Sequence, residues 1–353
     1  MSRFYISAFV LICSLFYFAD GHCRRGWRFE ISPEEEARDG PWFTGSLLAP
    51  SAHVVPPGYF NLEPYLFVTD NYGAYDADWH GHSTPTAIQL NPLISFQIGV
   101  ANNLDFQTAP QMFYTRKQGK ASAQFGDFPV GFDYQLLKDR KGGWWPAIKI
   151  AIRESFPTGK YQKLNPHKNG TDGVGSGAYT TGFGLAFSRI FHFGGVHFLN
   201  SRLSFSYNVP SNVHVKGFNS YGGGHGTRGT VHPGNTFTTI IGLEFTLALH
   251  WALALDIANI YGNKTTFSGR RGITSAGAPV KVGGPSFNQV SLAPAIEYNF
   301  NESVGIIAGA WFTVAGRNTT QFASGVIAVN WFANYKTTKK ADKFKFPQGG
   351  KFN

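Results

Sequence analysis

Eight charged residues have the spacing expected of side chains that line a passage through a protein. Each lies in a stretch where polar and apolar residues alternate, which places the polar residues on one face of a β-strand. A charged face of this kind suits a water-filled interior, where it could form a constriction that selects polar or anionic solutes. Salt bridges between the same residues could instead hold a narrow interior shut. The eight candidates are Glu63, Asp133, Lys149, Arg153, Arg202, Glu244, Asp256 and Glu297.

Two pairs of these candidates flank expected short turns. Asp133 and Lys149 lie equally far from a turn centred near residue 141, which predicts an ion pair between neighbouring strands. Glu244 and Asp256 flank a turn near residue 250 at matching depth, where two close carboxylates repel each other unless a cation lies nearby. The candidate cations are Arg153 and Arg202.

Signals for metal or enzyme chemistry are weak. His80-Gly81-His82 and the run from Gly222 to His225 could offer imidazole ligands to zinc or copper, but no cysteine or regular His-x₃-His pair occurs near them. Neither G-x-S-x-G nor HExxH is present, and the Ser176 region lacks the strand–turn–helix setting of a nucleophile elbow. We therefore predict no metal site, no cofactor and no catalytic residue. The histidines of the expected outer loops are His80, His82, His167, His214, His225 and His232.

Twelve segments carry the alternation, and several have 12 to 14 residues, whereas strands usually have about five or six. A tilted strand needs about 9–11 residues to cross hydrocarbon. The connections alternate between long and short, as in bacterial outer-membrane barrels with short periplasmic turns and longer extracellular loops. The expected long connections are 70–86, 117–124, 157–177, 210–235 and 263–286. The expected strands are 59–69, 87–100, 105–116, 125–137, 144–156, 178–190, 196–209, 236–249, 251–262, 287–300, 303–315 and 322–335.

Aromatic residues cluster beside the short connections, as expected of a girdle where an apolar wall meets lipid headgroups. A soluble barrel would instead turn its charged face to water, and hydropathy alone does not separate the two. Strand length, the girdle and the loop asymmetry favour an all-β, transmembrane, antiparallel up-and-down β-barrel of about 12 strands with periplasmic termini. The girdle residues are Trp144, Trp145, Phe191, Phe193, Trp251, Phe300, Trp331 and Tyr335.

The composition excludes other classes of protein. Charged residues make up 15% of the 353 residues, against about 25% in typical globular proteins, which excludes disorder driven by charge. The 42 Gly and 33 Phe residues favour strands and turns over helical bundles.

The chain divides into four expected parts. Residues 1–21 resemble a cleavable signal peptide, because Arg3 precedes an apolar run and small residues follow it. Residues 22–57 lack periodicity and form a periplasmic arm, an inward-folded plug or, as we favour, a leader strapped against the barrel. The barrel itself spans 58–335, and 336–353 form a basic tail.

The net charge of +10 is diffuse between the termini and forms no stripe that could follow a phosphate backbone, so no nucleic-acid partner is predicted. The expected location is the outer membrane of a Gram-negative bacterium. The expected partners are outer-membrane lipids, the barrel assembly machinery and a small-molecule solute. Neither the oligomeric state nor a role for Cys23 is predicted.

Four motifs carry a resemblance to a known family: Gly58–Tyr65, Gly126–Tyr134, Phe156–Gly159 and Gly177–Ala186. They resemble strands of the transporter-like outer-membrane barrels grouped with the meta-pathway of phenol degradation. The resemblance covers roughly residues 58–335 and implies a channel or transporter for small, hydrophobic or aromatic solutes. A closed barrel whose surface loops bind a host or partner molecule is the first alternative. A barrel lipid hydrolase is the second.

Overall fold

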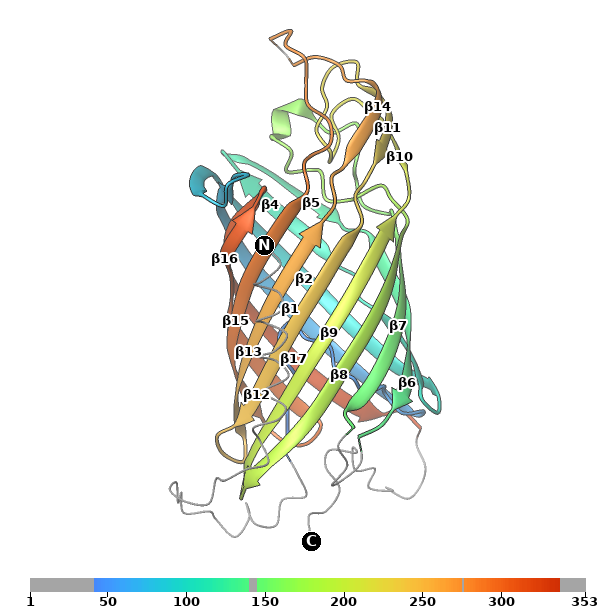
Figure 1. The fold of residues 1–353 in the computed structure, drawn as a ribbon, viewed down its shortest axis with the longest axis vertical. Coiled ribbons are helices and arrows are strands. Elements are labelled where there is room, and N and C mark those ends of the chain that lie inside the picture. The colour runs from blue at the N-terminus through green and yellow to red at the C-terminus, as the bar shows by residue number, and fades with distance from the viewer. Residues whose placement is uncertain (1–40, 140–144, 275, 337–353) are drawn as a thin grey trace.

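The computed structural model describes residues 41–139, 145–274 and 276–336, which form a closed antiparallel β-barrel with a cap at one end (Figure 1). The expected signal peptide, Cys23, Trp144 and the tail beyond Lys336 lie outside these residues. The wall consists of β1 (Tyr59–Tyr75), β2 (Gly81–Ala101), β3 (Leu104–Thr108), β4 (Met112–Lys117), β5 (Lys120–Phe125), β6 (Phe128–Leu137), β7 (Ala147–Phe156), β8 (Thr180–Gly194), β9 (His197–Pro210), β12 (Thr236–Thr246), β13 (Trp251–Gly262), β15 (Phe287–Asn299), β16 (Val304–Arg317) and β17 (Thr319–Asn334).

The barrel closes because β1 pairs with both β2 and β17, so that the first and last strands are neighbours. Two wall strands are interrupted: β3 and β4 together form the third, and β5 and β6 together form the fourth. The wall therefore has twelve antiparallel strands, which confirms the predicted fold class. Among the described residues, no helix has the length and apolar character needed to cross a membrane.

The interruption of the third and fourth strands follows from local sequence. Ala109-Pro110-Gln111 separates β3 from β4, and Pro110 has no N–H to donate to a neighbouring strand. On the fourth strand, Gly126-Asp127 separates β5 from β6. Because β4 pairs with β5 and β3 with β6, both breaks fall at the same level of the wall.

Two of the expected long connections are wrong. The segment 117–124 is a tight hairpin, since only Gln118 and Gly119 separate β4 from β5. Both have positive φ, 48° and 75°, as a type I′ turn requires. The segment 70–86 is mostly strand, because β1 continues to Tyr75 and β2 begins at Gly81. The polar composition of these segments therefore reflects strand ends beyond the apolar wall rather than loops.

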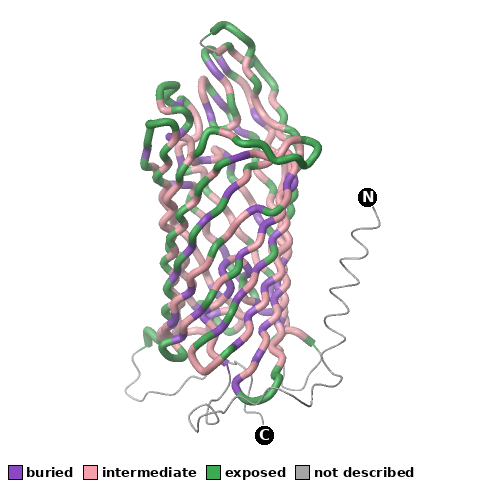
Figure 2. Tube along the Cα trace, turned by 90° about the vertical axis from the view of Figure 1, so that its left-hand side faces the viewer, coloured by how far each residue is buried: buried purple, intermediate pink, exposed green. Residues whose placement is uncertain are grey.

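The two faces of the wall differ in the way that separates a membrane barrel from a soluble one. Large apolar side chains such as Phe132, Ile152 and Phe183 are exposed on the outside, each by about half of its surface. Asp133 and Lys149 on two of the same strands point inward and are buried, and buried and exposed positions alternate along much of the wall (Figure 2). The predicted girdle residues Trp145 and Phe300 are 73% and 53% exposed beside the short connections. A soluble barrel would instead bury the apolar face and expose the charged one.

An arginine at Leu243 tests this assignment. Leu243 lies near the middle of β12 with its side chain on the outer face, where Leu243→Arg is expected to cost about 2–4 kcal/mol in a bilayer. Leu243→Ala is the control, because it removes the same apolar side chain without adding a charge. Urea unfolding of the barrel in lipid vesicles measures the difference. Equal stability of the two variants would contradict the outward orientation.

The cap is built from the three remaining long connections. These contribute β10 (Val213–Lys216), β11 (Arg228–His232), β14 (Thr266–Arg270) and the 3₁₀ helix η2 (Pro166–Lys168). The three short strands form a separate sheet in the order β10-β11-β14 at the end opposite the short connections (Figure 1). One face of this sheet buries Val213, Val215 and Val231 against Tyr161 and Tyr221.

Candidate functional site in the barrel lumen

Strand alternation directs the predicted charged residues into the lumen, where several are completely buried. Asp133, Glu244, Asp256 and Glu297 have 0% of their surface exposed, and so does Asp105, which is not among the predicted residues. Asp105 shares its inward parity with Gln107 and Asp133, so the alternation on β3 contained the signal for it. Buried carboxylates need hydrogen bonds or cations to compensate for lost hydration, and the structure supplies both.

Asp133 lies at the centre of a buried cluster of charges. Lys149 Nζ lies 2.6 Å and Arg153 Nη1 2.5 Å from its two carboxylate oxygens, and Gln107 Nε2 donates at 2.7 Å. The predicted ion pair between Asp133 and Lys149 is confirmed. Its register is not, because Asp133 lies opposite Ala151 and Lys149 lies opposite Gln135, two residues away from the predicted pairing. Lys149 therefore reaches Asp133 diagonally.

In the second acidic group, Glu244 forms an ion pair with Arg202. Its Nη2 lies 2.7 Å from Glu244 Oε2, which also accepts a 2.6 Å hydrogen bond from Asn200. Arg202 is thus a partner of Glu244, as predicted. The predicted matching depth of Glu244 and Asp256 is wrong, since Asp256 lies opposite Gly242 on β12.

Residues 41–57, which we call the lumen segment, lie inside the barrel and bind these carboxylates through backbone N–H groups. Thr44 N donates to Glu297 Oε2 at 2.7 Å, and Leu48 N donates to Asp256 Oδ2 at 2.9 Å. Ser46 Oγ donates to the other oxygen of Asp256. These contacts fix the first half of the segment to β15 and β13.

The second half of the lumen segment continues around the inner wall. Ala49 O accepts from Arg202 Nη1 on β9 at 3.0 Å. Farther along, Ala52 N donates to Ser188 Oγ of β8, Val54 N to Gln135 Oε1 of β6 and Val55 N to Asp105 Oδ2 of β3. The lumen segment therefore follows the inner wall in reverse strand order, from β15 to β3, near the end that carries the short connections.

Glycines in the wall make room for the lumen segment. A Cβ added to Gly242 would lie 2.6 Å from Ala49 Cβ, and one added to Gly305 would lie 2.1 Å from Thr44 Oγ1. A Cβ added to Gly99 would lie 2.0 Å from Pro56 O. Since real Cβ atoms do not approach other heavy atoms so closely, these positions require glycine while the segment is in place.

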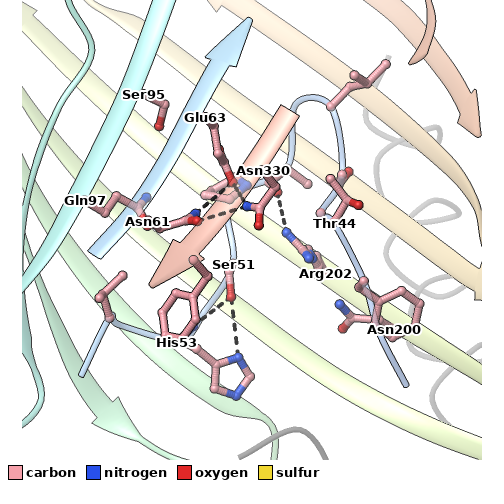
Figure 3. Close-up of a pocket in the computed structure, with 18 of the residues that line it drawn as sticks. Thr44, Ser51, His53, Asn61, Glu63, Ser95, Gln97, Asn200, Arg202 and Asn330 are labelled. Atoms are coloured by element: carbon pink, nitrogen blue, oxygen red, sulfur yellow. Dashed lines mark hydrogen bonds between the residues drawn. The ribbon is translucent and has the colours of Figure 1, made fainter. Parts of the chain in front are cut away.

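The lumen segment leaves part of the cross-section open. A cavity of about 290 Å³ lies between the segment and the wall at β1, β2 and β17 (Figure 3). Two acids, Glu63 and Glu302, line this cavity, and Glu63 accepts hydrogen bonds from Asn61 at 2.9 Å, Asn330 at 2.7 Å and Tyr65 Oη at 3.2 Å. Gln97 and Arg202 also line it.

A second cavity of about 270 Å³ lies against β7, β8 and β9. Lys149 and Arg153 line it, together with Leu48 and Pro50 of the lumen segment. Of the three cations that line these cavities, Arg153 is the most exposed, and Asp133, Glu244 and Glu297 lie behind their partners.

The lumen segment is also tied to a short connection. His53 Nε2 lies 3.0 Å from Asp139 Oδ1, just after β6, and His53 Nδ1 lies 3.4 Å from Ser51 Oγ (Figure 3). His53 and Ser51 are not among the predicted site residues, because they lie in a stretch without periodicity.

The outer cap does not bring the predicted histidines together. Within the described ranges there is no group of three or more His, Cys, Asp or Glu side chains that could hold a metal ion. His214 Nδ1 instead contacts Thr230 Oγ1, and His232 Nδ1 contacts Asn212 Oδ1.

Two titratable groups stabilise the cap. Burial raises the pKa of Asp172, but hydrogen bonds from Lys160 Nζ at 2.5 Å and Asn165 N at 3.1 Å more than offset it and leave the pKa below its usual value. Burial, with the nearby Asp127 carboxylate, raises the pKa of Tyr221 to about 12, and Tyr221 Oη donates to Ser176 O at 2.7 Å.

The lowered pKa of Asp172 predicts a pH dependence of the cap. Because the folded cap favours the ionised carboxylate, its contribution to stability is present above the unfolded pKa of about 4 and is lost as pH falls through the folded pKa. Asp172→Asn is therefore expected to speed hydrogen exchange of residues 160–172 at pH 7 and to have little effect at the lowest pH. A difference of the same size at both pH values would contradict this role.

Comparison with known proteins finds similarity in fold but not in sequence. No family model matches the chain, and no curated protein is similar to it in sequence. Among solved structures, the COG4313 outer membrane channel from Pseudomonas putida F1 has a TM-score of 0.60 at 10% identity, over 80% of this chain and 98% of that one. The NanC porin has a TM-score of 0.38 at 12% identity, over 75% of this chain and 98% of its own. The P. putida toluene transporter TodX has 0.34 at 12% identity, over 85% and 96%.

At 10% identity, the likeness to the COG4313 channel shows the fold alone. The described chain therefore has the fold of an outer-membrane β-barrel. Its grouping with the meta-pathway family remains a prediction from sequence.

Proposed function

We propose that this protein is an outer-membrane channel through which small solutes pass between the lumen segment and the wall. The observation that supports this most strongly is the incomplete filling of the lumen. Residues 41–57 follow the inner wall but leave a polar cavity of about 290 Å³ beside β1, β2 and β17. An apolar outer wall around a polar, partly open interior is the arrangement of porin-type barrels.

The eight predicted lumen residues divide into two roles in this proposal. Glu63, Arg202, Lys149 and Arg153 line the cavities, and the more exposed of them, Glu63 and Arg153, are the residues that a solute would contact. The other four are buried, pair with cations or with the lumen segment, and stabilise the interior: Asp133, Glu244, Asp256 and Glu297. The cavity lining favours polar solutes, whereas the hydrophobic or aromatic class rests on the family resemblance.

Location and folding are tested first. We expect the protein in the outer-membrane fraction, where lipids surround it and the barrel assembly machinery inserts it. On SDS gels it should run faster before boiling than after, because a closed barrel resists SDS until heated. A soluble periplasmic protein without a heat-dependent shift would contradict the proposal.

Conductance in planar lipid bilayers then tests the channel itself. Discrete conductance steps from the folded protein are expected, and their ion selectivity should change when Glu63→Gln removes one of the two carboxylates that line the larger cavity. A folded barrel that conducts no ions and passes no solute into vesicles would overturn the channel and favour the closed barrel whose surface loops bind a partner. Catalysis has no part in the proposed function.

A further inference from the structure

The outer cap carries a row of cations that the channel does not use. In the small sheet, Lys216 of β10 lies directly opposite Arg228 of β11, and Arg228 lies directly opposite Arg270 of β14. Directly opposite side chains project from the same face, with Cβ atoms about 5 Å apart. The sheet therefore presents three positive charges in one line, which we call the cation row.

The cation row is exposed and has no acidic partner in the described part of the chain. All three side chains are exposed, and none of them forms an ion pair there. Within the described residues, the charged ends of these side chains form one internal hydrogen bond, from Arg270 Nε to Gly226 O at 2.8 Å. Like charges directly opposite each other destabilise a sheet, so a bound anion would relieve a repulsion that the chain itself leaves in place.

The sequence around the small sheet adds to the excess of positive charge. The outer connections 157–179, 211–235 and 263–286 contain nine Lys and Arg residues and one acid, Asp172, which is bound to Lys160. The cations are Lys160, Lys163, Lys168, Lys216, Arg228, Lys264, Arg270, Arg271 and Lys281.

The orientation of the sheet directs the cation row away from the interior of the cap. Its opposite face buries Val213, Val215 and Val231 against the other loops. The row therefore points outward, at the end of the barrel opposite the short connections (Figure 1). In the proposed outer-membrane setting, this is the level of the phosphorylated saccharides of the outer-leaflet lipid.

We infer that the exposed face of β10-β11-β14 binds phosphate groups of lipopolysaccharide at the cell surface. Arg228 and Arg270 offer planar guanidinium groups that bind phosphate oxygens in pairs, and Lys216 adds a point charge. The inference depends on the outer-membrane location but not on conductance, so a barrel that binds lipopolysaccharide without conducting would leave it standing.

Binding of phosphorylated lipopolysaccharide to the detergent-solubilised, heat-modifiable barrel tests it. The triple variant Lys216→Gln, Arg228→Gln and Arg270→Gln is expected to bind about ten-fold more weakly, since exposed charge pairs contribute modestly one by one. Its control is Arg116→Gln, Lys117→Gln and Lys120→Gln at the β4–β5 hairpin, which removes the same charge from the same end of the barrel. Binding by the wild type should also weaken with added salt.

Two further probes identify the ligand chemistry. Chemically dephosphorylated lipopolysaccharide is expected to bind as weakly as the triple variant binds the intact lipid, and inorganic phosphate is expected to compete only at much higher concentration. Equal binding by the triple variant and the wild type would overturn the inference, as would an equal loss in the hairpin control. Binding of heparin but not of lipopolysaccharide would overturn it in favour of a soluble polyanionic saccharide.

Discussion

Gly242→Val is expected to raise the single-channel conductance severalfold. The new side chain enters the space that Ala49 occupies, because a Cβ at this position already lies 2.6 Å from Ala49 Cβ. The neighbouring contacts of the lumen segment with Asp256, through Ser46 and Leu48, break when the segment moves away. The polar passage then widens from the cavity beside β1 towards β13. Planar-bilayer recordings of the two proteins measure the effect.

Gly325→Val is the matched control. Gly325 is a wall glycine of β17, but a Cβ added there meets no atom within 4 Å. It should therefore leave the conductance unchanged. Deletion of residues 41–56 should raise the conductance at least as much as Gly242→Val. If the deletion leaves conductance unchanged while the barrel remains heat-modifiable, the lumen segment does not restrict the passage.

Asp133→Asn is expected to lower the free energy of unfolding by about 3–5 kcal/mol, the range for removal of one partner from a buried ion pair. The substitution leaves Lys149, whose side chain is 4% exposed, without its carboxylate. It also removes the negative charge that Arg153 contacts. Urea unfolding in lipid vesicles, followed by tryptophan fluorescence, measures the loss.

Two variants separate this effect from a simple change of charge. Asp78→Asn removes the same charge from an exposed turn and should change stability by less than about 0.5 kcal/mol. Asp133→Asn combined with Lys149→Met should recover part of the loss, because the second substitution removes the buried cation that has lost its carboxylate. A double variant less stable than Asp133→Asn alone would contradict the buried-pair explanation.

The sequence predicted which residues enter the lumen but not their exact depth. Alternation alone assigns the faces of Asp133, Glu244 and Asp256. Depth depends on turn geometry, and β6 pairs with β7 two residues away from the predicted register. An ion pair survives such a shift because long lysine side chains also reach diagonal neighbours.

The contacts of the lumen segment could not be predicted in the same way. They are made mostly by backbone N–H groups of an irregular stretch, which carry no residue-type signal. Their partners lie far along the chain: Thr44 and Glu297 are 253 residues apart. The wall glycines at 99, 242 and 305 were a usable signal only once the path of the segment was known.

The path of residues 41–57 also sets an order of assembly. The segment precedes β1 and is synthesised before any wall strand, yet its anchors extend as far as Glu297 on β15. It can therefore reach its final place only after nearly the whole wall has formed, since contacts this distant in sequence close late. Until then, the buried acids of the lumen remain hydrated. Docking of the lumen segment, which is synthesised before the wall strands, is thus the step that completes the interior of the barrel.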